Sequence, residues 1–288
     1  MRYWVSIGLL LAVASGVNAA MRADGPARAA PALLAEAPGR GDEAARVDIE
    51  LVLAVDVSFS MDMEELAVQR EGYAEAITSP EFLKALKSGP TGKVAVTYFE
   101  WAASTDQKII IPWRVIDGPE SADAVAVEIL KAPLRRASRT SISGAIYFAM
   151  PLFEQNEFHG LRQVIDISGD GANNNGAPVT LARDAALAKG IVINGLPIMV
   201  KELSFETMDI ENLDYYYEDC VVGGPGSFVV PIKSRDKFKE AIRSKLVLEV
   251  AGRMPPRDGS ARVIPVAASE PRISCGIGER MWQERFGR

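Results

Sequence analysis

The most restrictive feature of this sequence is a nearly unbroken apolar run at residues 49–55, which is followed at once by polar residues. A strand that is apolar at successive positions is buried on both faces, as a central strand of a parallel sheet is. After residue 48, short apolar runs alternate with longer segments whose apolar residues recur at helical spacing. This alternation predicts a doubly wound α/β fold, with a mostly parallel sheet and helices on both faces.

The expected strands and helices follow from these runs and from the Gly and Pro residues between them. The strands are expected at 49–55, 94–99, 108–116, 163–167, 191–196 and 227–231. The helices are expected at 61–78, 81–87, 119–131, 142–153, 180–189, 212–220 and 235–250. A short polar turn joins the second and third strands, which predicts an antiparallel hairpin at one edge of the sheet. In the helix at 119–131, the residues expected to face the core are Ala124, Val127, Ile129 and Leu130.

The N-terminus has the pattern of an export signal. Arg2 precedes an apolar run from Trp4 to Val17, and the small residue Ala19 stands where a signal peptidase would cleave. The alternative is an uncleaved membrane anchor, for which the apolar run is short. Export predicts a periplasmic or secreted protein. We therefore divide the chain into a signal peptide (1–19), a flexible leader (20–46), one domain (47–250) and a C-terminal tail (251–288) without a long periodic segment.

Charge and hydropathy exclude two classes of partner. The formal net charge of the 288 residues is -6, and no long run of Lys and Arg is present, so a nucleic-acid partner is not expected. Beyond the signal peptide, no apolar stretch reaches the roughly 20 residues that a membrane-spanning helix needs. We therefore expect no membrane span once the signal is removed.

Two cysteines, Cys220 and Cys275, lie far along the chain. In an oxidising compartment such a pair often forms a disulfide, which here would tie the tail back to the domain. The alternative is two separate thiols. Because His159 is the only histidine, a zinc site or a histidine-dependent catalytic triad is not favoured.

Oxygen-bearing side chains follow the predicted strand ends, where ligands bind in open parallel sheets. In an extended segment, residues two apart point to the same side, so Asp56, Ser58 and Ser60 can converge. Hard oxygen donors with few charges suit Mg²⁺, with Mn²⁺ or Ca²⁺ as alternatives. The candidate metal ligands are Asp56, Ser58, Ser60, Thr140 and Asp170. Residues expected at the rim, where a ligand would approach, are Phe59, Ser141, Asn173 and Asn174.

Simpler interpretations exist for each of these residues. Ser60 and Thr140 each precede a predicted helix, and either hydroxyl could serve as its N-terminal cap. Asp170 is followed by Gly171, a pair that is common in turns. Capping and metal ligation are compatible, and the presence of all three segments favours the metal site.

The combination of Asp56-x-Ser58-x-Ser60, Thr140 and Asp170-Gly171 resembles the metal ion-dependent adhesion site (MIDAS) of von Willebrand factor A domains, over residues 47–250. Further stretches resemble a bacterial A-domain-like family of uncharacterised function, labelled DUF1194. These stretches are 53–58, 69–73, Trp101, 112–113, 168–171 and 223–228. The resemblance implies the fold and the metal site but no activity. Phe59 departs from the pattern, because A domains usually carry a small residue there.

Three functions remain open from the sequence. The first is a binding module whose metal ion contacts a carboxylate of a protein partner without catalysis. The second is a metal-dependent hydrolase of the phosphoester class. The third is a structural envelope protein with a vestigial site. Neither a general base near the ligands nor a second metal cluster is visible in the sequence, which favours the binding module over the hydrolase.

Overall fold

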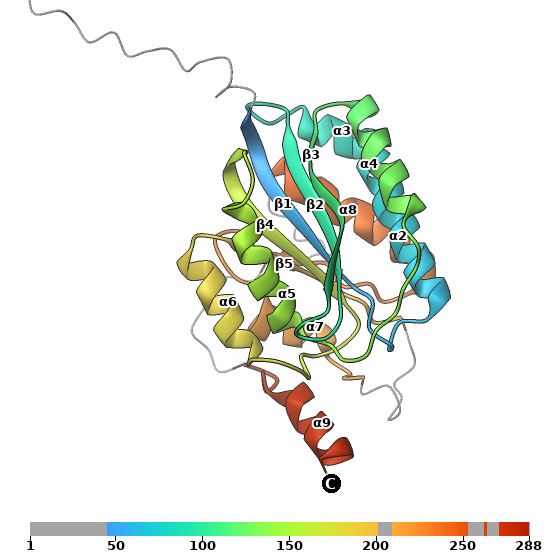
Figure 1. Cartoon of the computed structure of the whole chain (residues 1–288), viewed down its shortest axis with the longest axis vertical. Helices are drawn as coiled ribbons and strands as arrows, with labels where there is room; N and C mark the ends of the chain where they lie inside the picture. The colour runs from blue at the N-terminus through green and yellow to red at the C-terminus, as the bar shows by residue number, and fades with distance from the viewer. Residues whose placement is uncertain (1–44, 201–208, 253–261, 264–270, 288) are drawn as a thin grey trace, which may run out of the picture. The chain divides into compact units, whose positions relative to one another are not determined.

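The apolar run at residues 49–55 lies within the central strand β1 (Arg46–Asp56), of which every residue after Arg46 is buried. The computed structural model in Figure 1 describes residues 45–200, 209–252, 262–263 and 271–287, all within one unit that spans residues 40–288. The predicted signal peptide and nearly all of the predicted leader lie outside the described residues. β1 pairs in parallel with β2 (Val94–Trp101) on one side and with β4 (His159–Gly169) on the other.

In the described part of the chain the sheet has seven strands in the order β3-β2-β1-β4-β5-β6-β7. β3 (Gln107–Ile116) is the antiparallel edge strand, so the predicted edge hairpin is confirmed. β5 (Val192–Pro197) and β6 (Phe228–Val229) continue the parallel pairing, whereas β7 (Arg262–Val263) adds a second antiparallel pair that we did not predict. The mostly parallel sheet follows from strands whose two faces are both covered.

Helices cover both faces of the sheet, as predicted (Figure 1). One hydrophobic core lies between the sheet and α2, α3, α4 and α8, and a second lies on the opposite face against α5, α6 and α7. The helices are α2 (Met63–Thr78), α3 (Pro80–Leu86), α4 (Pro119–Lys131), α5 (Ile142–Ala149), α6 (Val179–Ala188), α7 (Leu213–Tyr216), α8 (Phe238–Ala251) and α9 (Ile277–Phe286). Short 3₁₀ turns at 150–153 and 235–237 and a π-helical turn at Tyr217–Val221 adjoin them. Among the described helices, none combines the length and the apolar character needed to cross a bilayer.

Two sequence-based expectations about helices were wrong. Of the four residues of α4 that we expected to face inward, Ile129 is buried, but Ala124, Val127 and Leu130 are exposed. The face that packs inward follows strict helical periodicity, and it consists of Ala122, Val125, Ala126 and Ile129. In the tail we expected no long periodic segment, yet the 10-residue helix α9 forms there. Its apolar side chains are few and are interrupted by charges, which conceals the helical pattern.

A buried ionic cluster joins α8 to the sheet. The ammonium group of Lys245 lies 2.7 Å from the Asp166 carboxylate on β4 and 2.7 Å from that of Glu249, and all three side chains are at most 1% exposed. Glu249 also accepts a 2.7 Å hydrogen bond from Asn194 on β5. Burial raises the pKa of Asp166 to about 6, although Lys245 opposes this shift and Glu249 adds to it. Asp166 therefore has a structural role.

Replacing Lys245 by Met should lower the free energy of unfolding by about 3–5 kcal/mol, because two buried carboxylates would lose the cation that lies 2.7 Å from each of them. The control is Lys239→Met on the same helix. Lys239 is 39% exposed and pairs with Glu71 and Glu75 on the surface, so its loss should cost less than about 1 kcal/mol. Denaturant unfolding measures both values. Equal losses for the two variants would contradict the structural role of the cluster.

The raised pKa of Asp166 also predicts a dependence of stability on pH. The folded protein holds this proton more tightly than the unfolded chain, in which the pKa is near 3.8. The stabilisation from Asp166 is therefore fully present below about pH 4 and is lost as the pH rises through about 6. The difference in unfolding free energy between wild type and Asp166→Asn should fall by roughly 3 kcal/mol across this window. Urea titrations across this pH range test it, and a difference that grows with pH would refute it.

Candidate metal centre

The Asp56 carboxylate lies at the carboxyl end of β1 and is fully buried. One oxygen, Oδ1, accepts a 2.7 Å hydrogen bond from the Ser58 amide, and the backbone carbonyl of Asp56 accepts one of 3.2 Å from Gln69. The other oxygen, Oδ2, has no hydrogen-bond partner among the described residues. A buried carboxylate oxygen without a partner is costly, so this atom marks a position that a ligand would satisfy.

Ser60 connects this strand end with the loop after β4. Its hydroxyl lies 2.7 Å from the Ser58 hydroxyl and donates a 2.6 Å hydrogen bond to Oδ1 of Asp170. The capping interpretation of Ser60 was wrong, because the N-cap of α2 is Asp62, which forms a capping box with Glu65. The structure thus brings the oxygens of Ser58, Ser60 and Asp170 together beside Asp56.

Thr140 lies next to the same loop. Its amide donates a 3.0 Å hydrogen bond to the Asn174 side chain, and its carbonyl accepts one of 2.8 Å from the Asn174 amide. A Cβ atom added at Gly171 would lie 3.6 Å from the Thr140 hydroxyl, which places this hydroxyl beside the Asp170-Gly171 pair. The cap of α5 is Ser141, not Thr140. All five predicted ligand residues therefore lie at one end of the sheet.

The electrostatics of this cluster suit a cation. Burial, and next the neighbouring Asp170, raise the pKa of Asp56 well above its usual range. The groups that lower this pKa are hydrogen-bond donors and not basic side chains. A divalent ion would offset both unfavourable effects and would satisfy Oδ2. The described residues contain no group of three or more His, Cys, Asp or Glu side chains that could hold a metal, so an ion here would depend on two carboxylates and on hydroxyls.

The four residues expected at the rim differ in their exposure and in their contacts. Phe59 is 58% exposed, and the Arg136 guanidinium lies 5.4 Å from its ring centroid. Asn174 is half-buried, and its side chain accepts a hydrogen bond from the Thr140 amide. Ser141 and Asn173 are fully buried, and their place at the rim stays a prediction. Ser141 caps α5 and Asn173 accepts the Ser143 amide, which are positioning contacts.

Sequence reasoning missed Tyr217 and Gly169. A Cβ atom added at Gly169 would lie 2.9 Å from Oδ2 of Asp56 and 2.9 Å from the Tyr217 hydroxyl, so only glycine leaves room for both groups. The Tyr217 hydroxyl is buried, and no described residue forms a hydrogen bond with it. Burial, and then Asp56, raise its pKa well above the ordinary value. The run of three tyrosines at residues 215–217 was the available signal.

A buried ion-pair network supports the segment before Thr140. Glu100 on β2 pairs with Arg70 of α2 and, at 3.0 Å, with Arg135, which also pairs with Asp106 at 2.8 Å. Arg70 donates in addition to the carbonyl of Ala132. The segment that leads to Thr140 is therefore fastened to the sheet and to α2.

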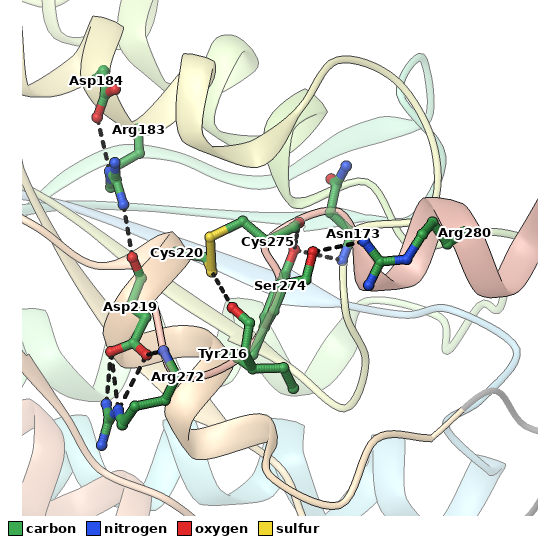
Figure 2. Close-up of a disulfide and its surroundings, with 11 residues drawn as sticks. Asn173, Arg183, Asp184, Tyr216, Asp219, Cys220, Arg272, Ser274, Cys275 and Arg280 are labelled. Carbon is green, nitrogen blue, oxygen red and sulfur yellow. Dashed lines mark hydrogen bonds and ion pairs between the residues drawn. A yellow bond between two sulfur atoms is a disulfide. The ribbon is translucent and has the colours of Figure 1, made fainter. Parts of the chain in front are cut away.

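Cys220 and Cys275 form a disulfide with their Cα atoms 5.4 Å apart (Figure 2). Cys220 is fully buried within the π-helical turn that follows α7, and Cys275 lies two residues before the start of α9. The bond connects the C-terminal segment to the side of the domain that carries β5 and α6.

Comparison with known proteins agrees with this fold. The sequence model of a family described as a protein of unknown function (DUF1194) matches residues 46–254. No protein of curated function matches the chain significantly.

Several solved structures are similar in fold. A von Willebrand factor type A protein from Catenulispora acidiphila has a TM-score of 0.51 and 13% identity, over 72% of this chain and 43% of that one. Proximal thread matrix protein 1 from the mussel byssus, with a zinc-occupied MIDAS motif, has a TM-score of 0.51 and 16% identity, over 72% and 48%. A pilus adhesin from Lactobacillus rhamnosus GG has a TM-score of 0.51 and 11% identity, over 72% and 30%. The chain spans less than half the length of each, and at these identities the likeness shows the fold alone.

Two neighbouring glycines provide a test of this geometry. Gly169→Ala would push a methyl group between Asp56 and Tyr217 and should destabilise the protein by about 1–3 kcal/mol. Gly171→Ala meets only ordinary contacts with Thr140 and should change stability by less than about 1 kcal/mol. Denaturant unfolding in the presence of EDTA measures the effect without a metal. Tolerance of Ala at both positions would argue against the tight approach at Gly169.

Proposed function

The chain belongs to the DUF1194 family, and from this membership and its von Willebrand factor A fold we propose that it is an exported, metal-dependent binding module. It would hold Mg²⁺, with Mn²⁺ or Ca²⁺ as alternatives, and bind a protein partner that presents a carboxylate. It would not catalyse a reaction.

The observation that carries this proposal is the convergence around the unpartnered Oδ2 atom of Asp56. Ser60 joins Ser58 and Asp170 through hydrogen bonds of 2.7 and 2.6 Å, so oxygens from two separate segments already lie within one cluster. Thr140 adds a third segment. Such a set of carboxylate and hydroxyl oxygens is the ligand chemistry that Mg²⁺ prefers.

Each ligand residue contributes a distinct property. Asp56 and Asp170 supply the negative charge, while Ser58, Ser60 and Thr140 supply neutral oxygens. When bound, the ion supplies positive charge and a coordination position that the protein does not fill. Two carboxylates formally balance the charge of a divalent ion, so an acidic group of a partner would be held by direct coordination at the open position. The exposed Phe59 and the adjacent Arg136 favour the same kind of ligand, since they offer an apolar contact and a positive charge.

Two further observations support the cellular location and the metal. A disulfide suits an oxidising compartment, and the N-terminal sequence has the pattern of an export signal, so we place the mature protein in the periplasm or outside the cell. The byssus protein of similar fold is described with a zinc-occupied MIDAS motif, which supports a metal at the corresponding end of this fold.

Metal binding is the first test of the proposal. Mg²⁺ at about 100 times its Kd should raise the free energy of unfolding by about 2.7 kcal/mol, and EDTA should reverse the gain. Asp56→Asn should weaken Mn²⁺ binding by about a hundredfold or more, measured by electron paramagnetic resonance titration. The control is Asp62→Asn, which leaves the α2 cap functional and the site unchanged.

Affinity capture from the native envelope tests the binding role. Wild type should retain a partner in Mg²⁺ and lose it in EDTA, and Asp56→Asn should retain none. Capture that is equal with and without the metal would refute the proposal, and EDTA-sensitive turnover of a phosphoester would replace it with the hydrolase.

A further inference from the structure

The C-terminal segment at residues 271–287, here called the C-terminal clamp, lies at the same end of the sheet as the candidate metal centre. Figure 1 shows α9 at the end toward which β1 and β4 run. The clamp lies outside residues 46–254, which the family model matches, and it carries none of the candidate ligands. Its contacts nevertheless reach both loops that supply Thr140 and Asp170.

One part of the clamp is anchored to the π-helical turn. The disulfide joins Cys275 to the buried Cys220 of this turn, and Arg272 pairs with Asp219 at 2.7 Å beside it (Figure 2). Arg272 also pairs with Glu218. Because Arg272 is 42% exposed, its ion pairs contribute little by themselves, and the covalent bond is the main anchor.

The other part contacts the loop that follows Asp170. The buried side chain of Asn173 donates a 2.7 Å hydrogen bond to Glu279 of α9, while its Oδ1 atom accepts the Ser143 amide at 3.0 Å. A Cβ atom added at Gly278 would lie 2.2 Å from the Asn173 carbonyl, so α9 rests directly on this backbone. Asn173 therefore joins α9, the Asp170 loop and the start of α5.

The clamp also contacts the residue before Thr140. Arg139 has a φ of 76°, a left-handed conformation that is rare for a side chain of this type and is retained only when its surroundings hold it. Its guanidinium lies 3.3 Å from the ring centroid of Trp282 on α9. The backbone that presents Thr140 is thus fixed from the clamp side as well as by Asn174.

We propose that the disulfide-anchored clamp is a positioning element of the metal centre: by holding Asn173 and Arg139 it fixes the two loops that carry Asp170 and Thr140. Release of the clamp loosens both loops and lowers the affinity for a divalent ion. The effect on metal affinity rests on the proposed function, whereas the restraint on the loops does not.

Reduction by a dithiol tests the anchor. A thiolate attacks Sγ of the partly exposed Cys275, Cys220 leaves as a thiolate, and the second thiol of the reagent resolves the mixed disulfide. Two electrons pass to the cysteines, which end as two thiols, and the dithiol becomes a cyclic disulfide.

The experiment compares full-length oxidised protein, the dithiothreitol-reduced protein, Trp282→Ala and Gln283→Ala. Trp282→Ala keeps the disulfide and removes the contact with Arg139, together with the stacking of Trp282 on Phe286 of the same helix, so it gives a test even if reduction unfolds the chain. Gln283 is exposed on the same helix and serves as the matched control. Amide hydrogen exchange in EDTA follows residues 139–143 and 171–177, and titration with Mn²⁺ measures affinity.

Reduction should accelerate amide exchange in both segments, whereas Trp282→Ala should accelerate it in residues 139–143. Each of these two changes should weaken Mn²⁺ binding about tenfold. Gln283→Ala should match wild type in both measurements. Unchanged exchange, or faster exchange with unchanged Mn²⁺ affinity, would overturn the inference. If the oxidised wild type does not bind Mn²⁺, the proposed function fails and the effect on affinity fails with it, while exchange still decides whether the clamp restrains the loops.

Discussion

The burial of the Asp56 carboxylate at the end of the central strand is the constraint on which the rest of this end of the molecule depends. A carboxylate with no exposure and one unpartnered oxygen is unfavourable in an apolar surrounding, and Asp170 adds a second negative charge nearby. Among the described residues, no basic side chain contributes to lowering its pKa. The surrounding loops instead bring neutral hydroxyls and backbone amides around it, an arrangement that suits a bound cation.

The two aspartates on and just after β4 have different partners. Asp166 and Asp170 both belong to the stretch that begins with β4, and Asp166 is also buried. The protein supplies Asp166 with its own cation, Lys245 of α8, at 2.7 Å. An acid in the core is thus paired with a lysine, whereas at the end of the sheet Asp170 receives the hydroxyl of Ser60. The first arrangement joins α8 to the sheet, and the second joins the loop after β4 to the segment after β1.

The second constraint is the precision with which three loops must meet. Two of these loops are held by contacts outside the ligand set. The Glu100 ion pairs hold the segment before Thr140, Asn174 bonds to Thr140 itself, and Asn173 holds the loop after Asp170. Asn173 also contacts α9, as does Arg139 before Thr140. Residues outside the ligand set therefore help to position the loops of the site.

The sequence by itself determined the parallel sheet, the edge hairpin and the convergence of Asp56, Ser58, Ser60, Thr140 and Asp170, because strand burial and strand-end position are local patterns. It did not determine which face of α4 packs inward, nor the presence of α9, since side-chain size and scattered charges obscured the helical period. Only the tertiary structure placed Tyr217, Gly169 and the clamp beside the site. Those contacts join residues that lie from 48 positions apart (217 − 169, Gly169 and Tyr217) to more than 100 positions apart, and no local pattern encodes such separations.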